Sequence, residues 1–233
     1  MKKNIYKNLY DSLKNSGDLG ESPRIKIMLS LIDGLNLTEK NILDIGCHDG
    51  TLLSLVKNRN NNFFGLDASG WAVEEARRKN IDVRQFFFDD AIRLPHEDGF
   101  FDLVVAGEII EHIFDTDFFL SEIRRVLKPE GRLLISTPNV ASLGRRLLLL
   151  LGRNPHFEIS PNEPESAGHI RYFTFETLGR ILAKHRFKIL RTKSDCVNFS
   201  GNGKRRSKKL AGIFPKLGAS IICLAEIDKA LES

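Results

Sequence analysis

Acidic, glycine and histidine residues gather at several places in the first half of the chain, each at or after the end of a short apolar run. The first place is a Gly-containing turn, in which residues 44–50 read Asp-Ile-Gly-Cys-His-Asp-Gly. An aspartate ends the second run, and an Asp-Ala pair follows the third. Glycines let a backbone approach a ligand closely, and a carboxylate at a strand end can hold an ammonium group or accept ribose hydroxyls. We therefore expect a cofactor site made of Asp44, Gly46, Cys47, His48, Gly50, Asp67, Ala68, Asp90 and Ala91.

A second group of polar residues follows the fourth apolar run. If a helix begins there, Glu108, Glu111 and His112 lie at positions i, i+3 and i+4 and project from one face. Acidic and imidazole groups at this spacing can bind one divalent ion, and His169 would join them if the segment before it folds back. His112 can instead act as a metal-free general base, and both glutamates can be ordinary helix-start acids. The expected metal ligands are thus Glu108, Glu111, His112 and His169, with Glu111 and His112 as catalytic residues.

The elements that must position these residues alternate between strands and helices. Apolar runs predict five strands, at residues 41–45, 62–67, 83–88, 101–106 and 132–136. Helical spacing at 72–79 and 119–127 places helices between them, and a turn is expected at 128–131. This alternation implies a parallel sheet covered on both faces. A helix around 175–182 and two antiparallel strands, 187–197 and 219–227, with no helix between them, complete the pattern.

Two further regions lie outside this alternation. Residues 1–40 predict N-terminal helices at 5–13 and 24–35, and residues 41–233 form one α/β domain. An insertion at about 138–172 is interpreted as a cap over the site. Within it a helical stripe is flanked by Arg145, Arg146 and Arg153, which suits either a packed cap or a helix lying on a membrane surface. The stripe consists of Leu143, Leu147, Leu148 and Leu151.

Composition excludes several classes of protein. The 233 residues are 42% hydrophobic and 28% charged, which argues against disorder. No apolar stretch approaches the roughly 20 residues of a membrane span, and no secretory signal is evident, so we expect a cytoplasmic protein. Three cysteines at wide spacing support neither a disulfide framework nor a zinc site. The net charge of +5 is concentrated in residues 204–209, a solvated loop or a patch for phosphate or anionic lipid.

The motifs resemble those of class I S-adenosylmethionine-dependent methyltransferases. The resemblance runs from about residue 41 to 136 and rests on the acids and glycines above, on Phe101-Asp102-Leu103-Val104 and on Leu127-Lys128-Pro129-Glu130-Gly131. It implies a Rossmann-like seven-stranded sheet, mostly parallel with an antiparallel last strand and with helices on both faces. It also implies that the Gly turn holds the methionine part of the cofactor, Asp67 the ribose and Asp90 the adenine amino group.

One departure from the family pattern is His48, where glycine is usual. His tolerates left-handed backbone better than most residues do, so this substitution alters the turn without excluding cofactor binding. A nicotinamide dehydrogenase shares the second-strand acid but requires Gly at position 48 and usually at 51, where this chain has His and Thr.

The Glu-x-x-Glu-His pattern with a later His is similar to quinone-pathway O-methyltransferases and small-RNA 2'-O-methyltransferases, a resemblance that implies Mg²⁺. The leucine-rich helix resembles methionine-biosynthesis-associated and glycan-cluster enzymes, for which we infer no metal. The first hypothesis is O-methylation of a sugar, polyol or catechol-like acceptor, which the membrane contact above would allow to be lipid-linked. RNA 2'-O-methylation through the basic segment, or a cofactor-binding partner protein without transfer activity, are the alternatives.

Overall fold

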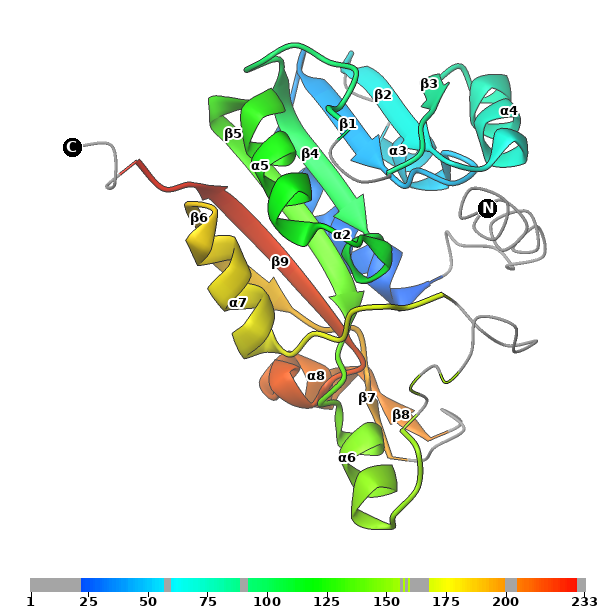
Figure 1. The fold of residues 1–233 in the computed structure, drawn as a ribbon, viewed down its shortest axis with the longest axis vertical. Coiled ribbons are helices and arrows are strands. Elements are labelled where there is room, and N and C mark those ends of the chain that lie inside the picture. The colour runs from blue at the N-terminus through cyan, green and yellow to red at the C-terminus, as the bar shows by residue number, and fades with distance from the viewer. Residues whose placement is uncertain are drawn as a thin grey trace.

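A seven-stranded sheet forms the centre of the computed structural model, which describes residues 22–56, 60–88, 92–155, 157, 159, 168–199 and 205–229. The strand order is β3-β2-β1-β4-β5-β9-β6 (Figure 1). Strand β9 runs antiparallel to both of its neighbours, β5 and β6, and the other strand pairs of this sheet are parallel, which confirms the predicted topology. The strands are β1 (Asn41–Ile45), β2 (Asn62–Asp67), β3 (Asp82–Gln85), β4 (Phe101–Gly107), β5 (Leu127–Pro138), β6 (Phe187–Lys193) and β9 (Ser220–Ile227).

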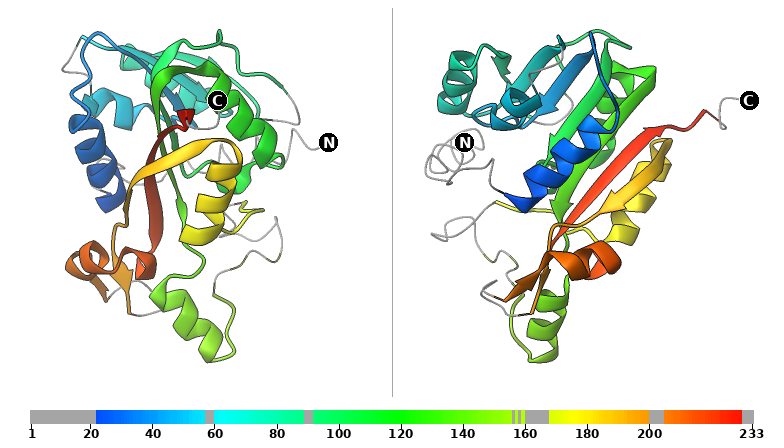
Figure 2. Two further views of the ribbon diagram at one scale, coloured as in Figure 1. Left: turned by 90° about the vertical axis from the view of Figure 1, so that its left-hand side faces the viewer. Right: turned by 180° about the vertical axis from the view of Figure 1, so that it is seen from behind.

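Helices cover both faces of the sheet (Figure 2). One face packs against α2 (Pro23–Asp33), α3 (Thr51–Val56) and α4 (Gly70–Arg78). The other packs against α5 (Thr116–Val126) and α7 (Phe175–Lys184). Strand β4 shows why both faces must be covered: Leu103 points into the first core and Val104 into the second, and each is fully buried. Successive strand side chains point to opposite faces, so a continuous apolar run needs helices on both.

Four local predictions were wrong, one of them being the strand expected at 187–197, because β6 ends at Lys193. Strand β3 ends at Gln85 rather than residue 88, and β5 continues through the expected turn at 128–131, with a register shift against β4 between Phe101 and Leu103. A helix, α8 (Lys208–Ile213), lies between β6 and β9 where none was expected. It has six residues and is capped by Ser207, so it is too short to show a helical period in the sequence.

The insertion after β5 begins with helix α6 (Leu143–Leu150), which extends away from the sheet (Figure 1). The expected leucine stripe does not pack into a core: Leu147 is 39% exposed and Leu151 is 70% exposed. The N-terminal helix expected at 5–13 lies outside the described residues, whereas α2 confirms the second one. No helix in the described part of the chain is long and apolar enough to cross a membrane.

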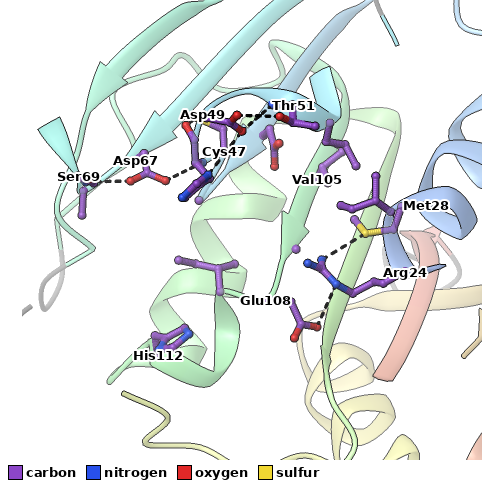
Figure 3. A pocket seen from close by; sticks show the side chains of 18 of the residues that line it. Arg24, Met28, Cys47, Asp49, Thr51, Asp67, Ser69, Val105, Glu108 and His112 are labelled. Carbon is purple, nitrogen blue, oxygen red and sulfur yellow. Dashed lines mark hydrogen bonds and ion pairs between the residues drawn. The ribbon is translucent and has the colours of Figure 1, made fainter. Parts of the chain in front are cut away.

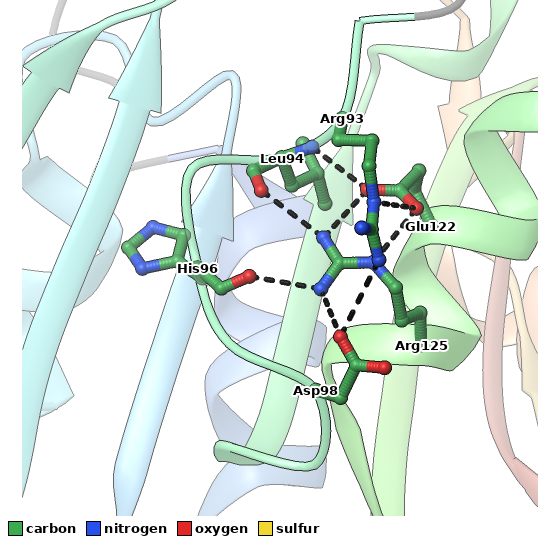
Figure 4. Close-up of polar contacts among 6 residues, drawn as sticks. All are labelled: Arg93, Leu94, His96, Asp98, Glu122 and Arg125. Atoms are coloured by element: carbon green, nitrogen blue, oxygen red, sulfur yellow. Dashed lines mark hydrogen bonds and ion pairs between the residues drawn. The ribbon is translucent and has the colours of Figure 1, made fainter.

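A buried ion pair anchors the segment that follows β3. Glu122 and Arg125 on α5 contact each other at 2.6 Å, and both reach the loop before β4 (Figure 4). Glu122 accepts a hydrogen bond from the backbone N–H of Leu94, while Arg125 donates to the carbonyls of Leu94 and His96 and pairs with Asp98. The loop is therefore held to α5 by charge-assisted hydrogen bonds rather than by apolar packing alone.

We expect Arg125→Met to lower the free energy of unfolding by about 2 kcal/mol, because it removes the closer of the two cations at the buried Glu122 carboxylate and leaves only Arg93, at 3.7 Å. The control is Arg78→Ala, which breaks an exposed pair with Glu75 and should cost about 0.5 kcal/mol or less. Guanidinium denaturation measures both. Equal losses in the two variants would contradict the anchoring role.

Candidate functional site

A cavity of about 260 Å³ opens where β1, β2 and β4 end. Six of the nine residues expected at a cofactor site line it (Figure 3): Asp44, Gly46, Cys47, His48, Asp67 and Ala68. These strands are parallel, so their carboxyl ends meet at one edge of the sheet, where open α/β sheets bind ligands. Asp90 and Ala91 lie outside the described residues.

The turn after β1 is built from left-handed backbone. Gly46 and Gly50 have φ of +74° and +72°, and His48 has φ of +47°. Gly50 does not line the cavity; a Cβ there would come within 2.5 Å of the Ile81 side chain, so this glycine allows α3 to pack closely. The His48 ring packs edge-on against Trp71 at 5.4 Å between centroids. His48 thus adopts the left-handed conformation that the sequence analysis considered compatible with this turn.

Asp67 joins this turn to the next one. Its carboxylate accepts hydrogen bonds of 2.8 Å from the backbone N–H groups of His48 and Ser69. Ser69 in turn caps α4 by accepting from the backbone N–H of Ala72. Burial raises the pKa of Asp67, and the two backbone hydrogen bonds oppose that rise. The carboxylate is therefore held rigidly at the cavity wall.

The buried carboxyl of Asp44 is the cavity acid whose ionisation is most strongly disfavoured by its surroundings. It is 5% exposed, and burial together with the neighbouring Asp67 raises its pKa to about 8, although the Arg24 guanidinium acts in the opposite direction. A positively charged ligand group beside Asp44 would remove this penalty. The site is thus suited to an ammonium or another cation.

Several residues that sequence reasoning missed also shape the cavity. Arg24 and Met28 reach it from α2, and the Arg24 guanidinium lies between Met28 and Glu108 (Figure 3). No local motif marks them, because they arrive from a separate helix. Asp49 accepts from Thr51 and Lys79, contacts that lower its pKa despite burial. The position of Asp49 inside the Gly-containing turn was the sequence feature that could have indicated its role.

Glu108 does not join a helix with Glu111 and His112, so the expected helical spacing was wrong, and the group of possible metal ligands in the described residues is Glu111, His112 and His169 without Glu108. Its φ is +56°, and only residues Ile110–His112 form a single 3₁₀ turn. The left-handed residue turns the Glu108 side chain toward Ser136, which donates to it at 3.3 Å, and toward Arg24 at 3.9 Å. Glu108 consequently faces the cofactor-side cavity instead of the other three residues.

Glu111, His112 and His169 do come together, as expected. Ligand atoms of all three lie within 4.8 Å of one another, and the two imidazole centroids are 4.9 Å apart. The segment carrying His169 is held by backbone hydrogen bonds from Ile170 and Arg171 to the Glu111 carbonyl. This returning stretch is the part of the insertion that reaches the site; no described residue of the insertion lines the cavity itself.

Neither Glu111 carboxyl oxygen makes a hydrogen bond of good geometry among the described residues, although His169 Nε2 lies 4.0 Å from Oε1 and the Thr137 hydroxyl acts to lower the Glu111 pKa. Its side chain is 1% exposed and both oxygens are buried. Burial, and secondarily the Glu108 carboxylate, raise the pKa of Glu111 well above its ordinary range. A buried, unsatisfied carboxyl is costly, so this group is suited to receive a cation or a donor from a ligand.

Comparison with known proteins identifies the fold's relatives. Residues 24–192 match the family described as "Methyltransferase domain". The chain belongs to the class I S-adenosylmethionine-dependent methyltransferases. Among solved structures, a possible histamine N-methyltransferase from Thermotoga maritima shares its fold with a TM-score of 0.66 at 18% identity, covering 98% of this chain and all of that one. A Burkholderia thailandensis N-methyltransferase with bound S-adenosylhomocysteine has a TM-score of 0.64 at 14% identity, covering 98% of this chain and 89% of that one.

Curated relatives match over shorter segments. A probable S-adenosylmethionine-dependent methyltransferase of Mycolicibacterium smegmatis is 34% identical over 43% of this chain and 38% of its own length. A mitochondrial ubiquinone biosynthesis O-methyltransferase of Bos taurus is 30% identical over 49% of this chain and 33% of its own length. The matched segments thus span little more than a third of these relatives, so substrate and activity are taken up as proposals.

Asp44→Asn tests the electrostatics of the cavity. A buried carboxyl whose pKa rises from 3.8 to about 8 on folding makes the ligand-free protein lose stability as pH rises between those values. The asparagine variant lacks this loss, so its melting temperature relative to the parent should increase between about pH 5 and about pH 9. Parallel melting curves across this range would contradict the raised pKa.

Asp117→Asn serves as the matched control for that experiment. Lys184 and His185 lower the pKa of this exposed carboxyl, so it stays ionised throughout this range and its removal should change the melting temperature by the same amount at every pH tested.

Proposed function

We propose that the chain binds S-adenosylmethionine in the cavity at the ends of β1, β2 and β4 and transfers its methyl group to a hydroxyl group of a small-molecule acceptor. Family membership supports the cofactor. The observation that carries the acceptor chemistry is the group formed by Glu111, His112 and His169, because His112 also lines the cofactor cavity. Acid–base groups thus stand where a methyl acceptor must approach.

The cavity supports a definite orientation of the cofactor. The Asp44 carboxylate would hold the ammonium of the methionine part, beside backbone of the Gly46–His48 turn, and Asp67 would accept the ribose hydroxyls. Asp90, the expected adenine contact, lies outside the described residues. Acids outnumber the single cation Arg24 around the described cavity lining, which favours a ligand that carries both an ammonium and a sulfonium.

His112 is the proposed general base. Its Nδ1 lies 3.1 Å from the Gly168 carbonyl oxygen, which can only accept a hydrogen bond. Nδ1 therefore carries the proton in the neutral ring, and Nε2 is the basic nitrogen. In the reaction the acceptor oxygen bonds to the methyl carbon, the carbon–sulfur bond breaks with its electron pair going to sulfur, and the hydroxyl proton passes to His112.

A divalent cation held by Glu111, His112 and His169 is the alternative way to activate the hydroxyl. The unpartnered Glu111 oxygens fit such an ion, which when bound would lower the pKa of a coordinated hydroxyl. Two imidazoles and one carboxylate are donors typical of transition-metal ions, whereas magnesium prefers oxygen ligands. The donor set therefore favours a transition-metal ion over the Mg²⁺ expected from the sequence.

The acceptor class we favour is a catechol-like ring or a polyol. The ubiquinone biosynthesis relative supports an oxygen acceptor, since its name states O-methylation. Treatment with a chelator distinguishes activation by His112 from activation by a metal ion. Methyl transfer should survive the chelator if His112 acts as the general base without a metal.

Asp67→Ala should weaken S-adenosylmethionine binding about a hundredfold, because two charge-assisted hydrogen bonds to the ribose are lost. Isothermal titration measures the affinity, with NADH as a control ligand and the exposed Asp82→Ala as a control variant. Asp67→Asn keeps one acceptor oxygen for the turn, so a folded Asn variant with weakened binding separates ligand contact from turn collapse. Unchanged affinity in both Asp67 variants would refute the assignment.

Glu111→Gln should reduce methyl transfer at least about a hundredfold while leaving cofactor affinity within about twofold of the parent. Release of S-adenosylhomocysteine in the presence of protocatechuate, sugars or RNA measures transfer. Glu108→Gln should have a smaller effect on transfer, since Glu108 lies apart from the three-residue group, and the exposed Glu176→Gln should have none. Full activity of Glu111→Gln would remove this residue from the mechanism.

A further inference from the structure

One end of the molecule carries an apolar and basic surface that the proposed reaction does not use. Helices α6 and α8 both pack against β7 (Val197–Asn198), which pairs with β8 (Arg206–Ser207), and all four lie at the same end in every view (Figures 1 and 2). We call the exposed side chains of residues 143–153, 197–199 and 205–217 the distal surface. It projects beyond the strand end from which the insertion departs.

Large apolar side chains are exposed on the distal surface. Leu150 is 81% exposed and Leu151 is 70% exposed, at the tip of α6. The large exposed apolar side chains of the distal surface include Leu149, Leu150, Leu151, Phe199, Ile213 and Phe214. Single exposed apolar residues are ordinary, but several on adjoining elements mark an interaction site.

The charge of the distal surface is one-sided. Residues 143–153 and 205–217 contain eight Arg and Lys and no Asp or Glu. Because the whole chain has a net charge of +5, the rest of the chain is net negative. The positive charge is therefore a property of this one end and not of the surface in general.

We propose that the distal surface docks on an anionic lipid bilayer. Leucines at the tip of α6 would enter the boundary between headgroups and acyl chains, while arginines and lysines beside them would contact lipid phosphates. A helix of eight residues with this composition suits interfacial binding and is too short to cross the bilayer. Nucleic acid would satisfy the cations and leave the leucines in water, and a protein partner of ordinary charge would leave the cations unmatched.

The location of the surface gives docking a consequence, which rests on the proposed function. The insertion leaves β5 at Pro138, forms α6, and returns through Gly168 and His169 to the Glu111 group. Docking would hold the protein at the membrane, where an amphiphilic or lipid-linked hydroxyl compound resides. Vesicle binding itself does not require methyl transfer, so it can be measured whether or not the proposed function holds.

The test is sedimentation of the full chain with vesicles of phosphatidylcholine alone or mixed with phosphatidylglycerol. We expect binding only to the mixed vesicles, with an affinity that falls as salt rises. Lys208→Glu with Lys209→Glu should weaken binding at least about 25-fold, since each basic residue near the surface contributes about fivefold. Leu150→Ser with Leu151→Ser should weaken it at least about tenfold.

Matched controls lie elsewhere on the surface: Lys188→Glu on β6 and Leu55→Ser on α3, both exposed, should bind vesicles as the parent does. Equal binding to neutral vesicles, no binding to the mixed ones, or retention on single-stranded RNA without vesicle binding would overturn the proposal. So would sedimentation velocity showing that the two leucines hold copies of the chain together. Each variant is also titrated with S-adenosylmethionine. Substitutions on the distal surface should leave this affinity unchanged, so a failure of vesicle binding is distinguished from a failure of the proposed function.

Discussion

The carboxylate of Asp67 joins two turns that come from different strands. By accepting the backbone N–H groups of His48 and Ser69, it fixes the distance between the end of β1 and the start of α4. Backbone N–H groups in such turns have no helix or sheet partner, so a buried acceptor is needed to satisfy them. The wall of the cavity, including the left-handed His48, depends on this one buried group.

The same burial that surrounds Asp67 makes ionisation of the neighbouring acid Asp44 costly. Burial and the neighbouring Asp67 raise the cost of ionising Asp44, and Arg24 offsets only part of it. A cationic ligand would relieve this repulsion at the moment of binding, because opposite charge restores what desolvation removed. The acids at the strand ends thus suit a ligand that carries positive charge.

The acceptor side is assembled differently, from one loop after β4 and one returning segment of the insertion. Glu111 belongs to a short 3₁₀ turn, and the chain around residues 168–171 bonds to its carbonyl and to the His112 ring. Both this segment and α6 belong to the insertion that follows β5. Docking and chemistry would then share one insertion.

Sequence alone determined the features that depend on local pattern, namely the strand–helix alternation and the acids at the ends of β1 and β2, whereas the antiparallel β9 was expected from the family resemblance and from a missing helix that is in fact present. Periodicity and spacing specify these because side-chain direction repeats along each element. It could not determine that Glu108 leaves the group of Glu111, that Arg24 enters the cavity, or that the α6 leucines stay exposed. The tertiary structure decided these points, because a single left-handed residue redirects a side chain, and only the packed fold sets which distant surfaces meet.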